Sequence, residues 1–116
     1  MSTQLPPNIQ DKLNRLQQLQ NTMQQLTIQK QRLEVEVSES DKALKTLEGV
    51  SSEQKVYKSS GAILVEKEKD DVIKELTDRK DYLDMRSKVL EKQEKNTRDR
   101  LTSLQESLQK EINASK

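Results

Sequence analysis

The chain has 116 residues, of which 30% are hydrophobic and 35% charged, and its 21 basic residues balance 20 acidic ones. An ordinary globular domain is about 45–50% apolar, so a thick core is excluded. The even mixture of charges argues against a general electrostatic binder of nucleic acid. Cysteine and histidine are absent, which excludes thiolate metal sites and removes the commonest general base. We expect one domain, residues 1–116, with no metal or cofactor.

Several classes of function are also not expected. No apolar run approaches the roughly 20 residues of a membrane span, and the stretch MSTQLPPNIQ lacks the basic and apolar regions of a secretory signal. The sequence has no glycine-rich phosphate-binding motif, and a two-helix coil has no closed pocket for a substrate. Only Tyr57 and Tyr82 could stack on bases. We therefore expect a cytoplasmic protein that is not an enzyme and that has neither nucleic acid nor a membrane as a partner.

The first predicted element is a helical arm over residues 9–48. Pro6-Pro7 can open a helix because the first helical N–H groups lack partners, and Gly49 follows where a helix-ending glycine belongs. Core-compatible residues recur at alternating steps of four and three, with one 3–3 step near the start that should overwind the coil locally. This first seam consists of Ile9, Leu13, Leu16, Leu19, Met23, Leu26, Lys30, Leu33, Val37, Ser40, Leu44 and Leu47.

The second predicted element is a β-hairpin over residues 54–67, which contain the stretch VYKSSGAILVEK. A two-residue turn at Ser60-Gly61 would join its strands. The expected partners are Lys58 with Ile63, Tyr57 with Leu64 and Val56 with Val65. Alternation then places Val56, Ile63 and Val65 on one face and Tyr57, Ala62 and Leu64 on the other.

Both faces of this hairpin are largely apolar. A two-stranded hairpin alone is marginal in water, and its open edges invite pairing with another chain. We expect it to join the hairpins of other subunits in a shared sheet or barrel; the alternative is a loop that packs locally on the last layer of the coil. The residues expected to carry oligomerisation are Val56, Tyr57, Ile63, Leu64 and Val65.

A second helical arm is predicted over residues 70–113. Asp70 and Asp71 favour a helix start, and the preceding charged residues are expected to form a solvated connection. The seam again alternates between steps of three and four until a final 4–4 step. It consists of Ile73, Leu76, Lys80, Leu83, Ser87, Leu90, Glu94, Thr97, Leu101, Leu104, Leu108 and Ile112.

The two seams match layer by layer when the chain folds back at the hairpin. Such matching favours an antiparallel coiled coil within one chain. Examples of the expected layers are Leu44 with Leu76, Leu19 with Leu101, and Ile9 with Ile112. Polar seam residues such as Ser40 either specify the register, by excluding alternative pairings, or make the arm flexible. Lys30 should be able to pair with Glu94 across the seam.

The chain resembles the β-type subunits of prefoldin, and more closely the archaeal than the eukaryotic members. The resemblance covers nearly the whole chain. It is carried by the combination of a Val56-Tyr57-Lys58 strand, a glycine turn, an Ile63-Leu64-Val65 strand and arms of equal length, together with the stretches LPPNIQDKLNRLQQLQ, TIQKQRLEVEVSESDKALKTLE and LEKQEKNTRDRLTSLQ. A single hairpin is typical of the β type, since the related α type carries two.

This resemblance implies a set of partners and an activity. It implies a hexamer of two α and four β subunits (α2β4), in which the hairpins form a double β-barrel and the arms surround a cavity. It also implies ATP-independent capture of non-native client proteins and their delivery to a group II chaperonin. The alternative is a structural or tethering coiled coil that uses its hairpin only to oligomerise.

The outer ends of the arms are the expected client-binding site. Helix ends fray, and frayed coiled-coil ends expose apolar seam residues to which unfolded chains can bind. The alternative is that these residues only close the ends of the coil; the resemblance favours client contact. The residues are Leu5, Ile9, Leu13, Leu16, Leu104, Leu108 and Ile112.

Overall fold

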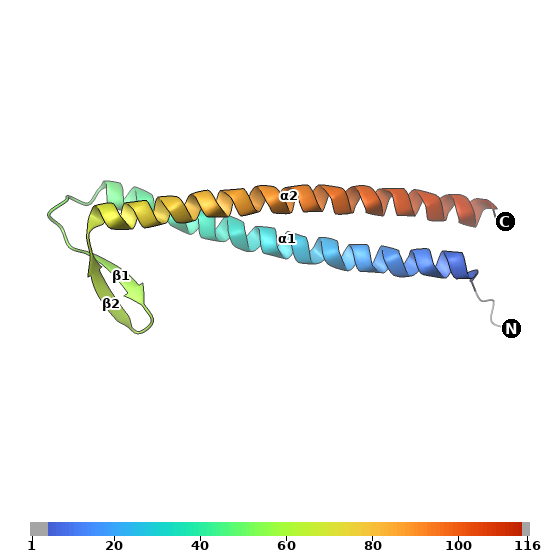
Figure 1. The fold of residues 1–116 in the computed structure, drawn as a ribbon, viewed down its shortest axis with the longest axis horizontal. Helices are drawn as coiled ribbons and strands as arrows, with labels where there is room; N and C mark the ends of the chain where they lie inside the picture. The colour runs from blue at the N-terminus through green and yellow to red at the C-terminus, as the bar shows by residue number, and fades with distance from the viewer. Residues whose placement is uncertain (1–4, 115–116) are drawn as a thin grey trace. The chain divides into compact units, whose positions relative to one another are not determined.

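The computed structural model describes residues 5–114, so residues 1–4 and 115–116 of the expected domain lie outside the described part. Two long helices precede and follow a two-stranded antiparallel sheet in chain order (Figure 1). The mainly α fold with a central β-hairpin is thereby confirmed. In chain order the elements are α1 (Pro7–Glu48), β1 (Val56–Ser60), β2 (Ile63–Lys67) and α2 (Lys69–Ala114).

The chain divides into two compact units, each made of a part of α1 and a part of α2. One unit, called the terminal unit, comprises the chain up to Lys30 together with the chain from Val89 onward. The other, called the hairpin unit, comprises Gln31–Lys88. Salt bridges join α1 to α2 within each unit, as an antiparallel pair requires. The two units are described separately below.

The ends of α1 follow from local chemistry. Pro7 is the first helical residue, where a missing N–H costs nothing. The Pro6 carbonyl accepts hydrogen bonds from the N–H groups of Ile9 and Gln10, both at 3.0 Å. At the other end the N–H of Gly49 donates to the Thr46 carbonyl at 3.2 Å, and Gly49 has no positive φ. The last turn therefore tightens instead of ending in a left-handed glycine.

In the hairpin unit the helices pack around the expected seam. Leu83 and Leu47 are buried, and so is the polar seam residue Ser40. The Lys80 ammonium lies 2.7 Å from the carboxylate of Asp41, the residue that follows Ser40 in the chain. This hydrogen-bonded carboxylate raises the pKa of Lys80 above its ordinary value. A seam lysine is thus tolerated because its ammonium leaves the apolar layer and pairs at the edge.

In the terminal unit four apolar seam residues are buried: Ile9, Leu26, Leu90 and Leu108. Glu94 is also buried. The Lys30 ammonium lies 3.7 Å from Glu94 Oε1, which confirms the expected pair across the seam. That oxygen has no hydrogen-bond partner within the described part of the chain. The Lys30–Glu94 pair is therefore a charge attraction without a hydrogen bond, which can still favour one register.

Two seam residues lie at the surface, and both occur at irregular steps of the heptad. Leu13 is the first residue of the 3–3 step, and Ile112 ends the final 4–4 step. Both are exposed, whereas the other residues of the two seams are buried or half-buried. A departure from the 3.5-residue repeat rotates side chains away from the partner helix, which explains why these two leave the seam.

The predicted register of the hairpin is wrong, because the turn lies one residue later in the sequence than expected. The turn is Gly61-Ala62, and Ser60 pairs with Ile63. The other pairs are Ser59 with Leu64, Lys58 with Val65, Tyr57 with Glu66 and Val56 with Lys67. Gly61 has a φ of 61° and no other residue in the described chain has a positive φ. A tight turn of type II′ needs such a residue at its first central position, so glycine must come first.

The corrected register keeps most of the expected faces. A shift of two residues in pairing preserves the alternation of side chains. Val56 therefore still shares a face with Ile63 and Val65, and Tyr57 still shares one with Leu64. Ala62 moves from a strand into the turn. Over residues 5–114, neither helix contains a window apolar enough to cross a membrane.

Candidate functional site

The hairpin presents large apolar side chains to solvent. Ile63 is 63% exposed, Leu64 69% and Tyr57 53%, and Val65 is also exposed. Val56 alone of the five expected oligomerisation residues is half-buried. Ile63 and Leu64 point to opposite faces of β2, so both faces of the sheet carry an uncovered apolar side chain.

The edges of this sheet are also open. The sheet contains only β1 and β2 over the described residues, so each strand has one edge whose backbone groups pair with no other strand. Open edges of this kind are templates for another chain. Uncovered faces and open edges together make the hairpin a candidate interface for another chain.

One ion pair ties the hairpin to α2 within the hairpin unit. The Lys58 ammonium donates a hydrogen bond to Glu75 Oε2 at 3.1 Å. This hydrogen bond and the charge of Lys58 lower the pKa of the Glu75 carboxyl below its ordinary value. Both side chains are about half exposed, so the pair orients β1 more than it stabilises the fold.

The expected client-binding residues fall into three groups by burial. Ile9 and Leu108 are buried at 5% exposure each. Leu16 and Leu104 are half-buried. The exposed group is Leu5, Leu13 and Ile112. The helix ends therefore offer a smaller apolar surface than the full set of seven residues.

A polar cluster that the sequence analysis missed closes the ends of the helices. The Lys12 ammonium pairs with the Glu111 carboxylate and lies 2.7 Å from the Ser107 hydroxyl. The Asn8 amide donates to the same carboxylate at 3.3 Å. Lys12 precedes Leu13 and Glu111 precedes Ile112, so opposite charges beside seam residues of neighbouring layers were the available signal.

Within residues 5–114, no group of three or more acidic side chains is placed to hold a metal ion. The acidic residues with shown partners form ion pairs along the helices and with the hairpin, as Glu36 does with Arg79 at 3.0 Å. These acidic side chains, apart from the buried Glu94, lie at the surface of the coiled coil and pair there with basic ones.

Comparisons with known proteins identify the relatives of this architecture. The family model described as "Prefoldin subunit" matches residues 10–115. The chain is 40% identical over 109 residues to prefoldin subunit beta of Pyrobaculum calidifontis, covering 94% of this chain and 87% of that protein. It is 41% identical over 106 residues to prefoldin subunit beta of Archaeoglobus fulgidus, covering 91% of each.

Solved structures give the same result. The crystal structure of the prefoldin beta subunit from Thermococcus strain KS-1 superposes with a TM-score of 0.83 at 32% identity, covering 94% of this chain and 96% of that one. The beta2 subunit from the same strain has a TM-score of 0.70 at 26% identity, covering 78% of this chain and 97% of that one. The similarity therefore extends over both helices and the hairpin.

Proposed function

Because the chain belongs to the prefoldin subunit family, we propose that it is an ATP-independent chaperone subunit that captures non-native proteins at its helix ends and passes them to a group II chaperonin. Prefoldin subunits form oligomers with other prefoldin subunits. In this proposal the protein acts in the cytoplasm by binding alone and catalyses no reaction.

Assembly is assigned to the hairpin. The partners are an α-type prefoldin subunit and other copies of this chain, in an α2β4 hexamer. The exposure of Tyr57, Ile63 and Leu64 supports this assignment, because such a surface is rarely left uncovered in a soluble protein. Val56 and Val65 lie on the same face as Ile63 and extend its apolar surface.

Client capture is assigned to the ends of the helices in the terminal unit. The observation that carries this assignment is the exposure of Leu5, Leu13 and Ile112 beside the buried Ile9 and Leu108. Exposed leucine and isoleucine side chains bind unfolded segments without a strict sequence requirement. The half-buried Leu16 and Leu104 would extend the same surface inward.

The test is suppression of aggregation by the complex with an α-type partner, with and without ATP. Removing residues 1–12 together with 109–116 deletes Leu5, Ile9 and Ile112 and leaves the hairpin intact. The truncated complex should keep its mass and protect a denatured client less well. ATP should change neither result.

Two outcomes would contradict the proposal. If the intact complex does not slow aggregation, the structural or tethering role becomes the better explanation. If the truncated complex protects the client as well as the intact one, clients bind elsewhere on the arms. Transfer is tested separately, by adding a group II chaperonin to a client-loaded complex and measuring release of the client.

A further inference from the structure

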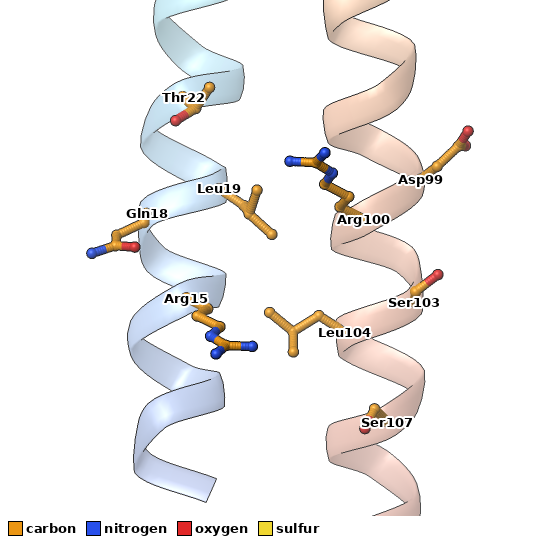
Figure 2. Close-up of a pocket in the computed structure, with 9 residues that line it drawn as sticks. All are labelled: Arg15, Gln18, Leu19, Thr22, Asp99, Arg100, Ser103, Leu104 and Ser107. Atoms are coloured by element: carbon orange, nitrogen blue, oxygen red, sulfur yellow. The ribbon is translucent and has the colours of Figure 1, made fainter. Parts of the chain in front are cut away.

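A groove of about 710 Å³ lies between α1 and α2 in the terminal unit, inward from the helix ends. Its volume falls within the roughly 300–1,000 Å³ of clefts that hold small ligands. The half-buried side chains of Leu19 and Leu104 form its apolar part. Figure 2 shows these two leucines extending from opposite helices into the space between them.

Two arginines flank this apolar part. Arg15 lies one turn before Leu19 on α1, and Arg100 lies one turn before Leu104 on α2. Both guanidinium groups point into the space between the helices (Figure 2). The Asp99 side chain also lines the groove but points away from this space. The interior of the groove is therefore apolar with positive charge on both sides.

Neither arginine is neutralised by the surrounding chain. Within residues 5–114, no salt bridge or side-chain hydrogen bond involves Arg15 or Arg100. Three other cations of the same unit pair with a glutamate, Lys12 with Glu111 and both Lys30 and Arg98 with Glu94. The two unpaired arginines are thus concentrated where the coil also leaves leucine side chains accessible.

We propose that this groove binds an extended client segment in which an apolar side chain lies between carboxylates. Leu19 and Leu104 would take the apolar side chain, and Arg15 and Arg100 would each take one carboxylate. Guanidinium groups bind carboxylates through two parallel hydrogen bonds. Because Arg15 and Arg100 are exposed to solvent, each pair contributes modestly. The arrangement selects acidic over basic flanks because two lysines would meet two arginines.

The inference rests on the proposed function, since it names a class of client segment that the terminal unit prefers. It adds a charge preference that apolar helix ends alone would not produce. The groove shares Leu104 with the client-binding surface at the helix ends, but Arg15 and Arg100 lie outside the segments 1–12 and 109–116 that the truncation removes. The charge preference can therefore be tested separately from the truncation.

The experiment uses the full complex and three short fluorescent peptides. They share a central apolar segment and differ only in their flanking residues, which are Glu, Gln or Lys. Binding is followed by fluorescence anisotropy at physiological salt. The Glu-flanked peptide should bind about tenfold more tightly than the Lys-flanked one, as expected for two partly exposed ion pairs, and the Gln-flanked peptide should fall between them.

Variants locate the effect. In Arg15→Gln/Arg100→Gln the three peptides should bind within about twofold of one another, because the apolar part remains and the selective charges are gone. The matched control is Arg32→Gln/Arg86→Gln, which removes the same charge from two exposed arginines of the hairpin unit. The control should keep the full preference, which excludes a general effect of net charge.

The outcomes separate the two proposals. A complex that suppresses aggregation but shows no flank preference, or keeps the preference in Arg15→Gln/Arg100→Gln, overturns the groove inference alone. A preference that depends on these arginines in a complex that suppresses no aggregation supports the groove and contradicts the proposed function. If the complex instead changes mass with concentration and Arg15→Gln/Arg100→Gln abolishes that change, the groove binds a second copy and the inference is wrong.

Discussion

The hairpin and the helix ends both carry apolar residues, but the structure treats them differently. Ile63 and Leu64 are more than 60% exposed on opposite faces of β2. Ile9 and Leu108 are packed into the seam of the terminal unit, with Leu13 and Ile112 at the surface nearby. A two-stranded sheet has no second layer that could cover it, whereas each helix can cover the apolar stripe of the other.

In the proposed function, this difference separates a permanent interface from an adjustable one. The apolar side chains of the hairpin are exposed in the single chain, and we propose that other subunits cover them. The helix ends already bury part of their apolar surface and can expose more when they fray. Weak and reversible binding suits clients, and continuous burial suits assembly.

The largest expected effect is on the hairpin. Ile63→Asp/Val65→Asp should prevent assembly, because the two carboxylates would be buried without partners at a cost of several kcal/mol. Sedimentation should report a smaller complex, while circular dichroism should show that the helices persist. The control is Met85→Asp/Val89→Asp, which places the same charges on two exposed apolar residues of α2. Assembly at full mass in the hairpin variant would show that the interface lies elsewhere.

The second effect compares a core leucine with a surface one. Leu83 is 1% exposed in the hairpin unit, and Leu83→Ala should lower the free energy of unfolding by about 2–5 kcal/mol. Leu13→Ala, at an exposed position of the terminal unit, should lower it by less than about 1 kcal/mol. Urea denaturation at fixed protein concentration measures both. Equal losses would mean that Leu13 is packed in solution.

The third effect concerns the closure of the helix ends. Lys12→Gln/Glu111→Gln removes a partly exposed ion pair and should lower stability by about 0.2–1 kcal/mol. Looser ends should expose Ile9 and Leu108 more often, so protection of a denatured client should improve slightly. The two single variants complete a double-mutant cycle. Unchanged stability together with weaker protection would indicate that Lys12 or Glu111 contacts the client directly.

The smallest effect is the pH dependence of the pair that ties β1 to α2. Lys58 lowers the pKa of Glu75 from its ordinary value of 4.5. The pair therefore contributes stability above pH 4.5, which is lost as the pH falls through the lowered pKa. NMR titration of the Glu75 carboxyl should show this shift, and Lys58→Gln should reverse it. An unshifted Glu75 in the intact protein would mean that the ion pair does not persist.

Most of the fold followed from periodicity in the sequence. The alternation of three and four between apolar residues predicted both helices and their antiparallel layers, because only that spacing keeps one stripe facing a partner. The same layers predicted the Lys30–Glu94 pair, which lies at 3.7 Å. The hairpin followed from a β-rich stretch interrupted by a single glycine.

The finer features depended on geometry that residue spacing does not contain. The position of the turn depended on which residue needs a positive φ, and Gly61 meets that need only as the first turn residue. The groove was not predicted either, because the direction in which Arg15 and Arg100 point depends on how the two helices are rotated toward each other.

Sequence by itself determined which residues can form the seam and which segment forms a hairpin with apolar faces, because both depend on local patterns of apolar side chains. Tertiary structure decided which seam residues are actually buried. Ile9 and Leu108 are buried while Leu13 and Ile112 are exposed, although all four are equally apolar. The reason is that burial depends on the distance and rotation of the partner helix, and an irregular step in the heptad changes that rotation.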